Sequence, residues 1–288
     1  MQQTTQNTGH KTIQITPSGQ ACGAVVTGVD LAEPLLDEEV ALLRTAWLTH
    51  HVLSFPQQQL DEDQFEAFAL QFGRFGRDEF FGPIPGRQHI AAIKREAEDT
   101  NPLFAESWHS DWSFQSEPPA ATCLYGLDIP PVGGDTLFAN QHLAWEAMPA
   151  ELKQKFRDKI AIHSAVLGYA PDGPYGDKQR RGSMDIRPSA EAYKTQNHPL
   201  VRPHPESGKP GIFGAPFAYI VGFEGLSEEE AKPLLLELNA WQTREAFIYR
   251  HQWHTHTLVM WDNRSVLHRA TGGYEGYRRE LHRITINA

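Results

Sequence analysis

The sequence is poor in cysteine: Cys22 and Cys123 are the two thiols in a chain of 288 residues. Two cysteines so far apart indicate neither a disulfide framework nor a cysteine metal site, and a reducing compartment is the simplest expectation. Long apolar runs are also lacking, and no stretch approaches the roughly 18 residues that a membrane-spanning helix requires. Segment 1–11 is polar and has no apolar core like that of a secretory signal peptide. We therefore expect a cytoplasmic protein that does not enter a membrane, with residues 1–11 forming a disordered tail.

Basic residues are also fewer than acidic residues. The chain has 26 lysines and arginines against 36 aspartates and glutamates, which gives a formal net charge of -10 at pH 7. Because nucleic-acid-binding surfaces are strongly basic, we expect no nucleic-acid partner. The excess of acidic residues contributes mainly to solubility.

Apolar residues and turn residues, in contrast, are plentiful. Hydrophobic residues make up 40% of the chain, enough for a large core, and 20 prolines and 23 glycines separate short apolar runs. Helical periodicity predicts helices at 36–50, 61–72, 143–156 and 227–244. Short strands are expected at 12–15, 23–30, 52–55, 89–93, 120–127, 135–140, 247–253, 258–262, 265–270 and 278–286. This order predicts an α+β, mainly β fold in one domain over 12–288: a double-stranded β-helix, or jelly roll, with flanking helices.

Residues 168–214 differ from the rest in composition, with many Gly, Pro, Asp, Tyr and Arg residues and little periodicity. A stretch of this length without regular structure inside a compact domain is usually a functional lid or a disordered insertion. Strand-like islands at 201–203 and 211–213 favour a partly ordered lid.

Segment 108–114, WHSDWSF, contains a histidine and a carboxylate two positions apart. We interpret it as a short strand, in which side chains i and i+2 leave the same face about 6 to 7 Å apart. His109 and Asp111 would then lie at chelating distance. A second imidazole would complete the 2-His-1-carboxylate set that binds non-haem Fe(II). A His-x-Asp tripeptide alone is weak evidence, because an exposed polar pair in a loop has the same pattern.

The C-terminal hairpin supplies further candidates. In the strand at 265–270, SVLHRA, alternation places His268 on one face, and the return strand at 278–286 places Arg279 and Arg283 together on one face. Burying a guanidinium costs several kcal/mol unless an anion meets it, and its planar fork suits a carboxylate. The alternative for each arginine is a salt bridge on a solvated face.

Four motifs together resemble those of the Fe(II)/2-oxoglutarate dioxygenases of the taurine dioxygenase and 2,4-dichlorophenoxyacetate dioxygenase (TauD/TfdA) family. The motifs are WHSD at 108–111, GGDT at 133–136, WDNRSVLHRA at 261–270 and RRELHR at 278–283. The resemblance covers nearly the whole chain and implies a jelly-roll enzyme that uses Fe(II), the cosubstrate 2-oxoglutarate and O2. It implies these roles: His109, Asp111 and His268 as iron ligands, Thr136 and Arg279 as the pair that binds the distal carboxylate of 2-oxoglutarate, and Arg283 as the contact to the anionic group of the substrate.

The resemblance also implies a reaction. The expected activity is hydroxylation of a small organic anion, such as a sulfonate, an aryloxy acid or a phosphonate, with release of succinate and CO2. In the taurine enzymes a histidine, a tyrosine and an asparagine stand where this chain has Asp78, Phe81 and Ala105. Taurine is therefore disfavoured as the substrate. The acidic pair Asp78 and Glu79 leaves open a zwitterionic substrate whose amine it would bind.

Two aromatic residues are further candidates for the substrate pocket. Trp112 follows the metal motif, and Phe217 matches a family position that often faces the substrate. Packing inside the barrel is an equally open alternative for both. His254 and His256 are also two apart, but we assign them to an exposed loop. The family forms dimers and tetramers, which implies a homo-oligomer.

Two other functions stay open. A metal-dependent hydrolase on the same barrel would use the two histidines and the aspartate for Zn²⁺, but it leaves Thr136 and Arg279 unexplained. A non-catalytic barrel that binds a ligand is the second alternative, and the intact set of site residues argues against it.

Overall fold

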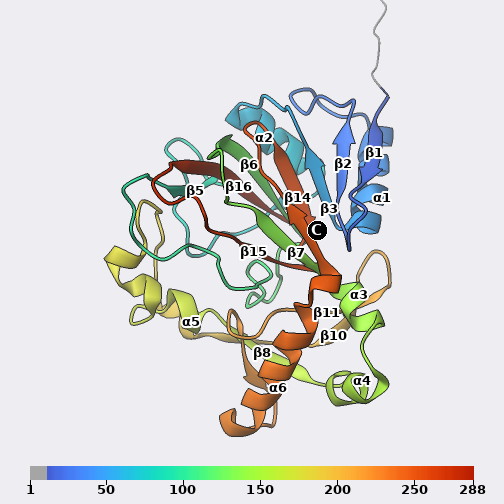
Figure 1. The fold of residues 1–288 in the computed structure, drawn as a ribbon, viewed down its shortest axis with the longest axis vertical. Helices are drawn as coiled ribbons and strands as arrows, with labels where there is room; N and C mark the ends of the chain where they lie inside the picture. The colour runs from blue at the N-terminus through green and yellow to red at the C-terminus, as the bar shows by residue number, and fades with distance from the viewer. Residues whose placement is uncertain (1–11) are drawn as a thin grey trace, which may run out of the picture.

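The computed structural model describes residues 12–288 and shows a mixed α/β protein built mainly of strands (Figure 1). The tail expected at 1–11 lies outside the described residues. The largest sheet has the order β1-β2-β3-β14-β6-β16-β4, and β5 also pairs with β16. Its strands are β1 (Gln14–Pro17), β2 (Ala24–Thr27), β3 (Val52–Phe55), β4 (Arg74–Phe75), β5 (Ala91–Arg95), β6 (Ala121–Asp128), β14 (Leu258–Asp262) and β16 (Arg279–Asn287).

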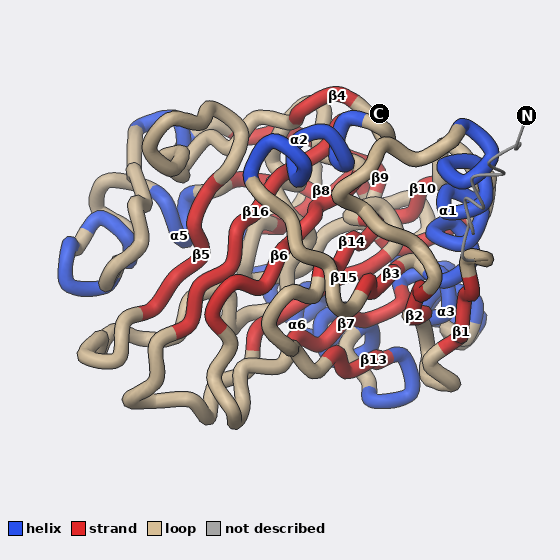
Figure 2. The backbone as a smooth tube through the Cα atoms, turned by 90° about the horizontal axis from the view of Figure 1, so that it is seen from above, coloured by secondary structure: helices blue, strands red, loops and turns tan. Residues whose placement is uncertain are grey.

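Smaller sheets complete the described architecture. One has the order β13-β7-β15, another β12-β8-β9, and β10 pairs with β11. Their strands are β7 (Thr136–Asn140), β8 (Ile160–Ser164), β9 (Thr195–Pro199), β10 (Val201–Pro203), β11 (Pro210–Ile212), β12 (Ile220–Phe223), β13 (Ile248–His251) and β15 (Val266–Ala270). Figure 2 shows β5, β16 and β6 running side by side in the large sheet.

Helices lie outside the sheets (Figures 1 and 2). They are α1 (Asp37–His50), α2 (Glu62–Leu70), α3 (Gln141–Glu146), α4 (Ala150–Phe156), α5 (Val166–Tyr169) and α6 (Glu228–Gln242), with 3-10 turns η1 (Pro174–Gly176), η2 (Lys178–Arg180), η3 (Ala190–Tyr193) and η4 (Glu245–Phe247). Within residues 12–288, no helix combines the length and the apolar character needed to cross a membrane.

Alternation along the strands divides the large sheet into two apolar faces. On the outer face, the strands pack against α1 and α2 through residues such as Leu53, Phe68 and Met260. On the inner face, residues such as Trp261 and Leu281 pack toward the sheet β13-β7-β15. The candidate functional residues of β7, β15 and β16 lie on the inward-facing side, between these two sheets.

Most predicted elements are confirmed to within a few residues. The strand at 52–55 matches β3, and α6 begins after the N-cap Ser227, whose hydroxyl accepts a hydrogen bond from the backbone N–H of Glu230. The single helix predicted at 143–156 is wrong, because α3 and α4 are separate helices. Pro149 immediately precedes α4, where the missing N–H of proline and its fixed φ are compatible with a helix start but not with a helix interior.

The short strand predicted at 108–114 is also wrong. His109 forms a single β-bridge to His268, and the chain turns at once through 111–114. Trp112 has a φ of 46°, which lies outside the β region. The two metal-ligand candidates converge because of this turn and not through strand alternation.

The segment 168–214 contains two different structures. Its second half includes β9, β10 and β11, and Leu200 and Ile212 are fully buried in an apolar core around α6. Its first half consists of short helical turns that pack Met184 and Ile186 against Phe81 and Trp112. The first half therefore borders the candidate site, and Tyr169 and Met184 line its cavity.

Candidate functional site

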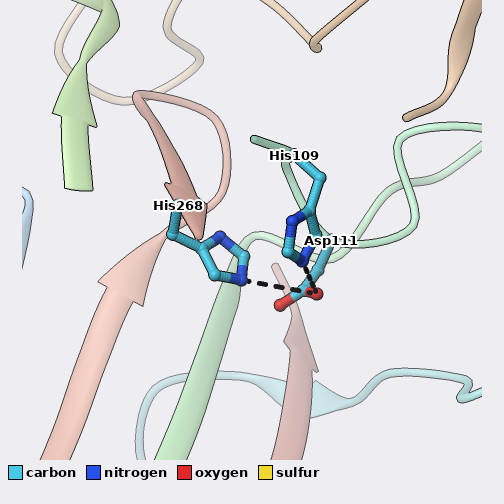
Figure 3. A group of neighbouring side chains, drawn as sticks. All are labelled: His109, Asp111 and His268. Carbon is cyan, nitrogen blue, oxygen red and sulfur yellow. Dashed lines mark ion pairs between the residues drawn. The ribbon is translucent and has the colours of Figure 1, made fainter. Parts of the chain in front are cut away.

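Two histidines and one aspartate converge between the two sheets. His268 lies on β15, and reciprocal backbone hydrogen bonds of 2.8 and 3.0 Å tie it to His109. The Nε2 atoms of both histidines lie 3.8 Å from Oδ1 of Asp111, and one ligand atom from each residue lies within 4.8 Å of the others. Figure 3 shows the three side chains pointing toward one another. All three are buried, which keeps bulk water from competing for their lone pairs.

Hydrogen bonds behind the cluster orient its donor atoms. Nδ1 of His109 donates to the carbonyl of Ser107 at 2.9 Å, which leaves the lone pair of Nε2 facing the cluster. Oδ2 of Asp111 accepts a hydrogen bond of 2.6 Å from the hydroxyl of Thr122. Asn263 donates to the same hydroxyl at 2.9 Å. Such outer contacts fix the orientation of metal ligands.

The protonation states favour cation binding. Burial lowers the pKa of His109 and His268, so both imidazoles are neutral near pH 7. Burial alone would raise the pKa of Asp111, but Arg283 and the two histidines outweigh it and lower this pKa to about 2. Two neutral imidazoles and one carboxylate are the donor set that suits Fe(II) and leaves further coordination positions open. The residues present therefore fit the metal.

Arg279 on β16 is a buried cation without an ion-pair partner among residues 12–288. Its Nη2 donates to the carbonyl of Gly134 at 3.1 Å, whereas its Nε has no hydrogen-bond partner in the described part of the chain. Gly134 has a φ of 71°, and a side chain there would bring a Cβ within 3.1 Å of Nε of Arg279. Glycine therefore permits the close approach, and the uncompensated charge provides a site for an anion.

Thr136 on β7 lines the same cavity as Arg279 and the histidine–aspartate cluster. The hydroxyl oxygen of Thr136 accepts a hydrogen bond of 2.9 Å from Nε1 of Trp253, so its own O–H remains available as a donor. A hydroxyl and a guanidinium in one cavity are suited to a carboxylate.

Arg283, four residues further along the inward face of β16, is balanced differently. Its Nη2 lies 3.1 Å from Oδ1 of Asp111, and its Nη1 lies 3.4 Å from Oδ1 of Asp78. The guanidinium also lies over the rings of Trp112 and Phe81, at 4.9 and 5.4 Å from their centroids. Burial would lower the pKa of Arg283, but the two carboxylates outweigh it and raise this pKa. Arg283 is therefore a charged group with partners already in place.

One cavity brings the histidine–aspartate cluster, Thr136, Arg279 and Arg283 together. Beside the polar groups, its wall is apolar and aromatic, and consists of Phe81, Phe104, Trp112, Tyr169, Met184 and Tyr219. Burial raises the pKa of both tyrosines, so their hydroxyls stay neutral. The wall can therefore bind an apolar body without adding charge.

Two of the predicted substrate contacts lie elsewhere. Phe217 does not line this cavity. It lines a neighbouring one and is 44% exposed. Asp78 does not line the cavity either, because it accepts a hydrogen bond from Nε1 of Trp112 and faces Arg283. The expectation that Asp78 would bind a substrate amine finds no support in this arrangement, because its carboxylate is already occupied.

Sequence reasoning did not identify several residues of the site. Thr122 supports Asp111, and Tyr169 and Tyr219 form part of the wall. Each comes from a segment distant in sequence, and no local motif marks it. Asn263 also supports the cluster, because its Oδ1 accepts a hydrogen bond from the backbone N–H of Asp111 at 3.3 Å. The exposed loop expected for His254 and His256 is confirmed.

Comparisons with known proteins agree with this geometry. Residues 14–285 match the model of the family described as "Taurine catabolism dioxygenase TauD, TfdA family". An alpha-ketoglutarate-dependent 2,4-dichlorophenoxyacetate dioxygenase of Cupriavidus pinatubonensis is 35% identical over 283 residues, covering 91% of this chain and 93% of that protein. An (S)-phenoxypropionate/alpha-ketoglutarate-dioxygenase of Delftia acidovorans is 33% identical over 273 residues, covering 90% and 89%.

A solved structure shows the same likeness in three dimensions. The crystal structure of AAD-2 in complex with Mn(II) and N-oxalylglycine superimposes with a TM-score of 0.78 at 28% identity, covering 96% of this chain and 98% of that one. The family match extends over nearly the whole described chain, and both relatives exceed 30% identity over most of their length. This chain therefore belongs to the TauD/TfdA family of alpha-ketoglutarate-dependent dioxygenases.

Proposed function

We propose that this dioxygenase hydroxylates a small organic acid with an apolar or aromatic body. One observation carries the proposal: Arg279, which is buried and has no ion-pair partner among residues 12–288, lines the same cavity as the histidine–aspartate cluster. A dicarboxylate cosubstrate explains this cation, since it places one carboxylate at the metal and the other at the arginine. The relatives that act on phenoxypropionate and dichlorophenoxyacetate make aryloxy acids the first substrate class to test.

Each residue has a distinct part in this proposal. His109, Asp111 and His268 hold Fe(II), which, with 2-oxoglutarate and O2, supplies the oxidising chemistry that inserts a hydroxyl group and leaves succinate and CO2. Thr136 and Arg279 bind the distal carboxylate of 2-oxoglutarate and fix its orientation. The aromatic wall excludes water and positions the substrate, with Arg283 at its polar end.

Further expectations support the same picture. We infer that the large sheet and the sheet β13-β7-β15 form the two halves of a jelly roll, with the first half of segment 168–214 as a lid on one domain. The two free, buried cysteines support a reducing, cytoplasmic location. A homodimer or homotetramer, as expected from the family, is testable by light scattering after size-exclusion chromatography.

A zinc hydrolase remains the rival function, because Zn²⁺ accepts the same ligands. Arg279 counts against it, since hydrolysis needs water and one substrate and requires no dicarboxylate cosubstrate to meet this buried cation. Thr136 likewise has no role in that reaction.

The test is a substrate screen with purified enzyme, Fe(II), 2-oxoglutarate and O2. Aryloxy acids, sulfonates, sulfate esters and phosphonates are compared by succinate release and by product mass. We expect coupled hydroxylation of at least one acid with an aromatic or alkyl body, and a large loss of affinity for it in Arg283→Ala. An Arg283→Ala enzyme with unchanged affinity and coupling for all such acids would contradict the assignment of Arg283.

A further inference from the structure

The two buried arginines of β16 differ in how their charge is balanced. Arg279 has no carboxylate at ion-pair distance within residues 12–288, whereas Arg283 has two, Asp111 and Asp78. A bound metal ion would engage the carboxylate of Asp111. Asp78 would then be the carboxylate that remains for Arg283.

Asp78 reaches Arg283 from outside the cavity. It follows β4, its side chain is 14% exposed, and it is absent from the cavity lining that includes both Arg283 and Trp112. It accepts a hydrogen bond from Trp112, and Trp112 in turn lies against the guanidinium of Arg283. Asp78 therefore contacts both the indole of Trp112 and the guanidinium of Arg283 on the side away from the cavity.

Arg283 nevertheless lines the cavity, and one of its donor atoms is buried without a hydrogen-bond partner among residues 12–288. Although its Nη2 lies 3.1 Å from Asp111, the geometry makes no hydrogen bond, and Nη2 has no other hydrogen-bond partner in the described chain. A carbonyl or ether oxygen can accept from such a donor without carrying charge. A negatively charged group can accept as well, but its charge would be repelled by the nearby Asp78.

We propose that Asp78 sets the charge selectivity of the substrate site. As a counter-ion of Arg283, it reduces the advantage of an anionic group over a neutral polar group at the end of the aromatic cavity. The substrate class therefore includes uncharged oxygen compounds, such as esters, amides or lactones with an apolar body, besides organic acids. This inference rests on the proposed function, because it assumes that the cavity beside Arg283 receives the substrate.

The experiment compares Asp78→Asn with the wild type. Asparagine keeps an oxygen that can accept from Trp112, but it removes the charge that faces Arg283. Both enzymes are loaded with Mn(II) and N-oxalylglycine, and the binding of phenoxyacetate and of neutral phenoxyacetamide is measured by calorimetry. In Asp78→Asn we expect the affinity for phenoxyacetate to rise roughly tenfold, the scale of one charge interaction near 1.4 kcal/mol, with little change for phenoxyacetamide.

Glu79→Gln is the matched control. It removes one negative charge from the neighbouring residue, but Glu79 pairs with the exposed Arg77 at 3.5 Å and not with Arg283. The ratio of the two affinities should stay at the wild-type value in this control. An equal ratio in wild type and Asp78→Asn, or no phenoxyacetate binding by Asp78→Asn, would overturn the inference. Failure of the wild type to bind N-oxalylglycine with Mn(II) would contradict the proposed function itself, and it is measured first.

Discussion

The polar side chains of this site differ in whether the protein itself supplies their hydrogen-bond or ion-pair partners. Arg279 is buried and has no carboxylate partner in the described chain, whereas Asp111 accepts a buried hydrogen bond of 2.6 Å from Thr122. An unsatisfied group lowers stability until its ligand arrives, whereas a satisfied group is oriented before binding. These two states lead to opposite expectations for mutations.

Replacing Arg279 by Gln should stabilise the protein without ligands while weakening cosubstrate binding. The substitution removes a buried unpaired charge, so we expect the free energy of unfolding in the absence of metal and 2-oxoglutarate to rise by about 1 to 3 kcal/mol. The affinity for 2-oxoglutarate should fall by roughly 100-fold or more, the scale of a lost charge-assisted pair. Urea unfolding and calorimetry measure the two effects.

Arg278→Gln provides the comparison for Arg279→Gln. Arg278 is the preceding residue, lies on the opposite face of the hairpin and pairs with Glu96, Asp128 and Glu280 at the surface. Its replacement should leave 2-oxoglutarate affinity unchanged. A ligand-free Arg279→Gln protein less stable than wild type would contradict the assignment of Arg279 as an uncompensated buried cation.

Thr122→Val should weaken metal binding without changing any proposed metal ligand. Valine has nearly the same shape but cannot donate to Asp111. Loss of an orienting partner of this kind typically reduces metal affinity by about 10- to 100-fold. Competition with a fluorescent chelator measures the affinity for Mn(II), and circular dichroism establishes that the variant folds. Unchanged Mn(II) affinity would remove Thr122 from the site.

At the level of elements, the sequence predicted the strands better than the turns. Strands β14, β15 and β16 were predicted because alternating apolar residues lie between clear turns. The turn at 111–114 was missed because Trp112 adopts a left-handed conformation that no residue preference indicates. The break between α3 and α4 was missed although Pro149 marks it.

The predicted site shows the same limit. His109, Asp111, His268, Thr136 and Arg279 carry recognisable motifs, and the structure brings them together around one cavity. Thr122, Tyr169 and Tyr219 act only through contacts between distant segments, so one sequence gives no signal for them. The sequence marks Asp78 by its charge, but the partners of its carboxylate, Trp112 and Arg283, follow only from the three-dimensional structure.

The loop before β12 stores backbone strain at the rim of the site. Phe217 has a φ of 66°, a conformation unfavourable for a bulky residue, and its ring is half exposed. Phe217→Gly should therefore be more stable than Phe217→Ala by about 1 kcal/mol, the reverse of the usual order of these two residues. Thermal or urea unfolding of the two variants measures the difference. The usual order, with Ala more stable, would contradict strain at this position.

At the level of the whole molecule, several histidines are buried and neutral outside the proposed metal site. Burial is the main cause that lowers the pKa of His51, His163 and His251 to about 3, from an ordinary value of 6.5. These histidines therefore become protonated near pH 6.5 in the unfolded chain, but only near pH 3 in the folded protein. Folding stability from these groups is complete above about pH 6.5 and decreases as the pH falls toward 3.

This linkage predicts a marked sensitivity to mild acid. At pH 5, each of these histidines should reduce the free energy of unfolding by about 2 kcal/mol relative to neutral pH. Urea unfolding of the metal-free protein at pH 7.5 and pH 5 measures the total. His163→Phe removes one of the three groups, and its loss of stability between the two pH values should be smaller by about 2 kcal/mol. An identical loss in wild type and variant would contradict the assignment for His163.

The central claim is that the histidine–aspartate cluster and Arg279 together hold Fe(II) and 2-oxoglutarate. Anaerobic titration of the protein with both, followed by visible absorption, tests it directly, because a keto acid chelated to Fe(II) gives a metal-to-ligand charge-transfer band. We predict a band in wild type, no band in His109→Ala or His268→Ala, and a band only at much higher 2-oxoglutarate concentration in Arg279→Gln. No band in wild type, together with tight binding of Zn²⁺, would contradict the account and favour the hydrolase.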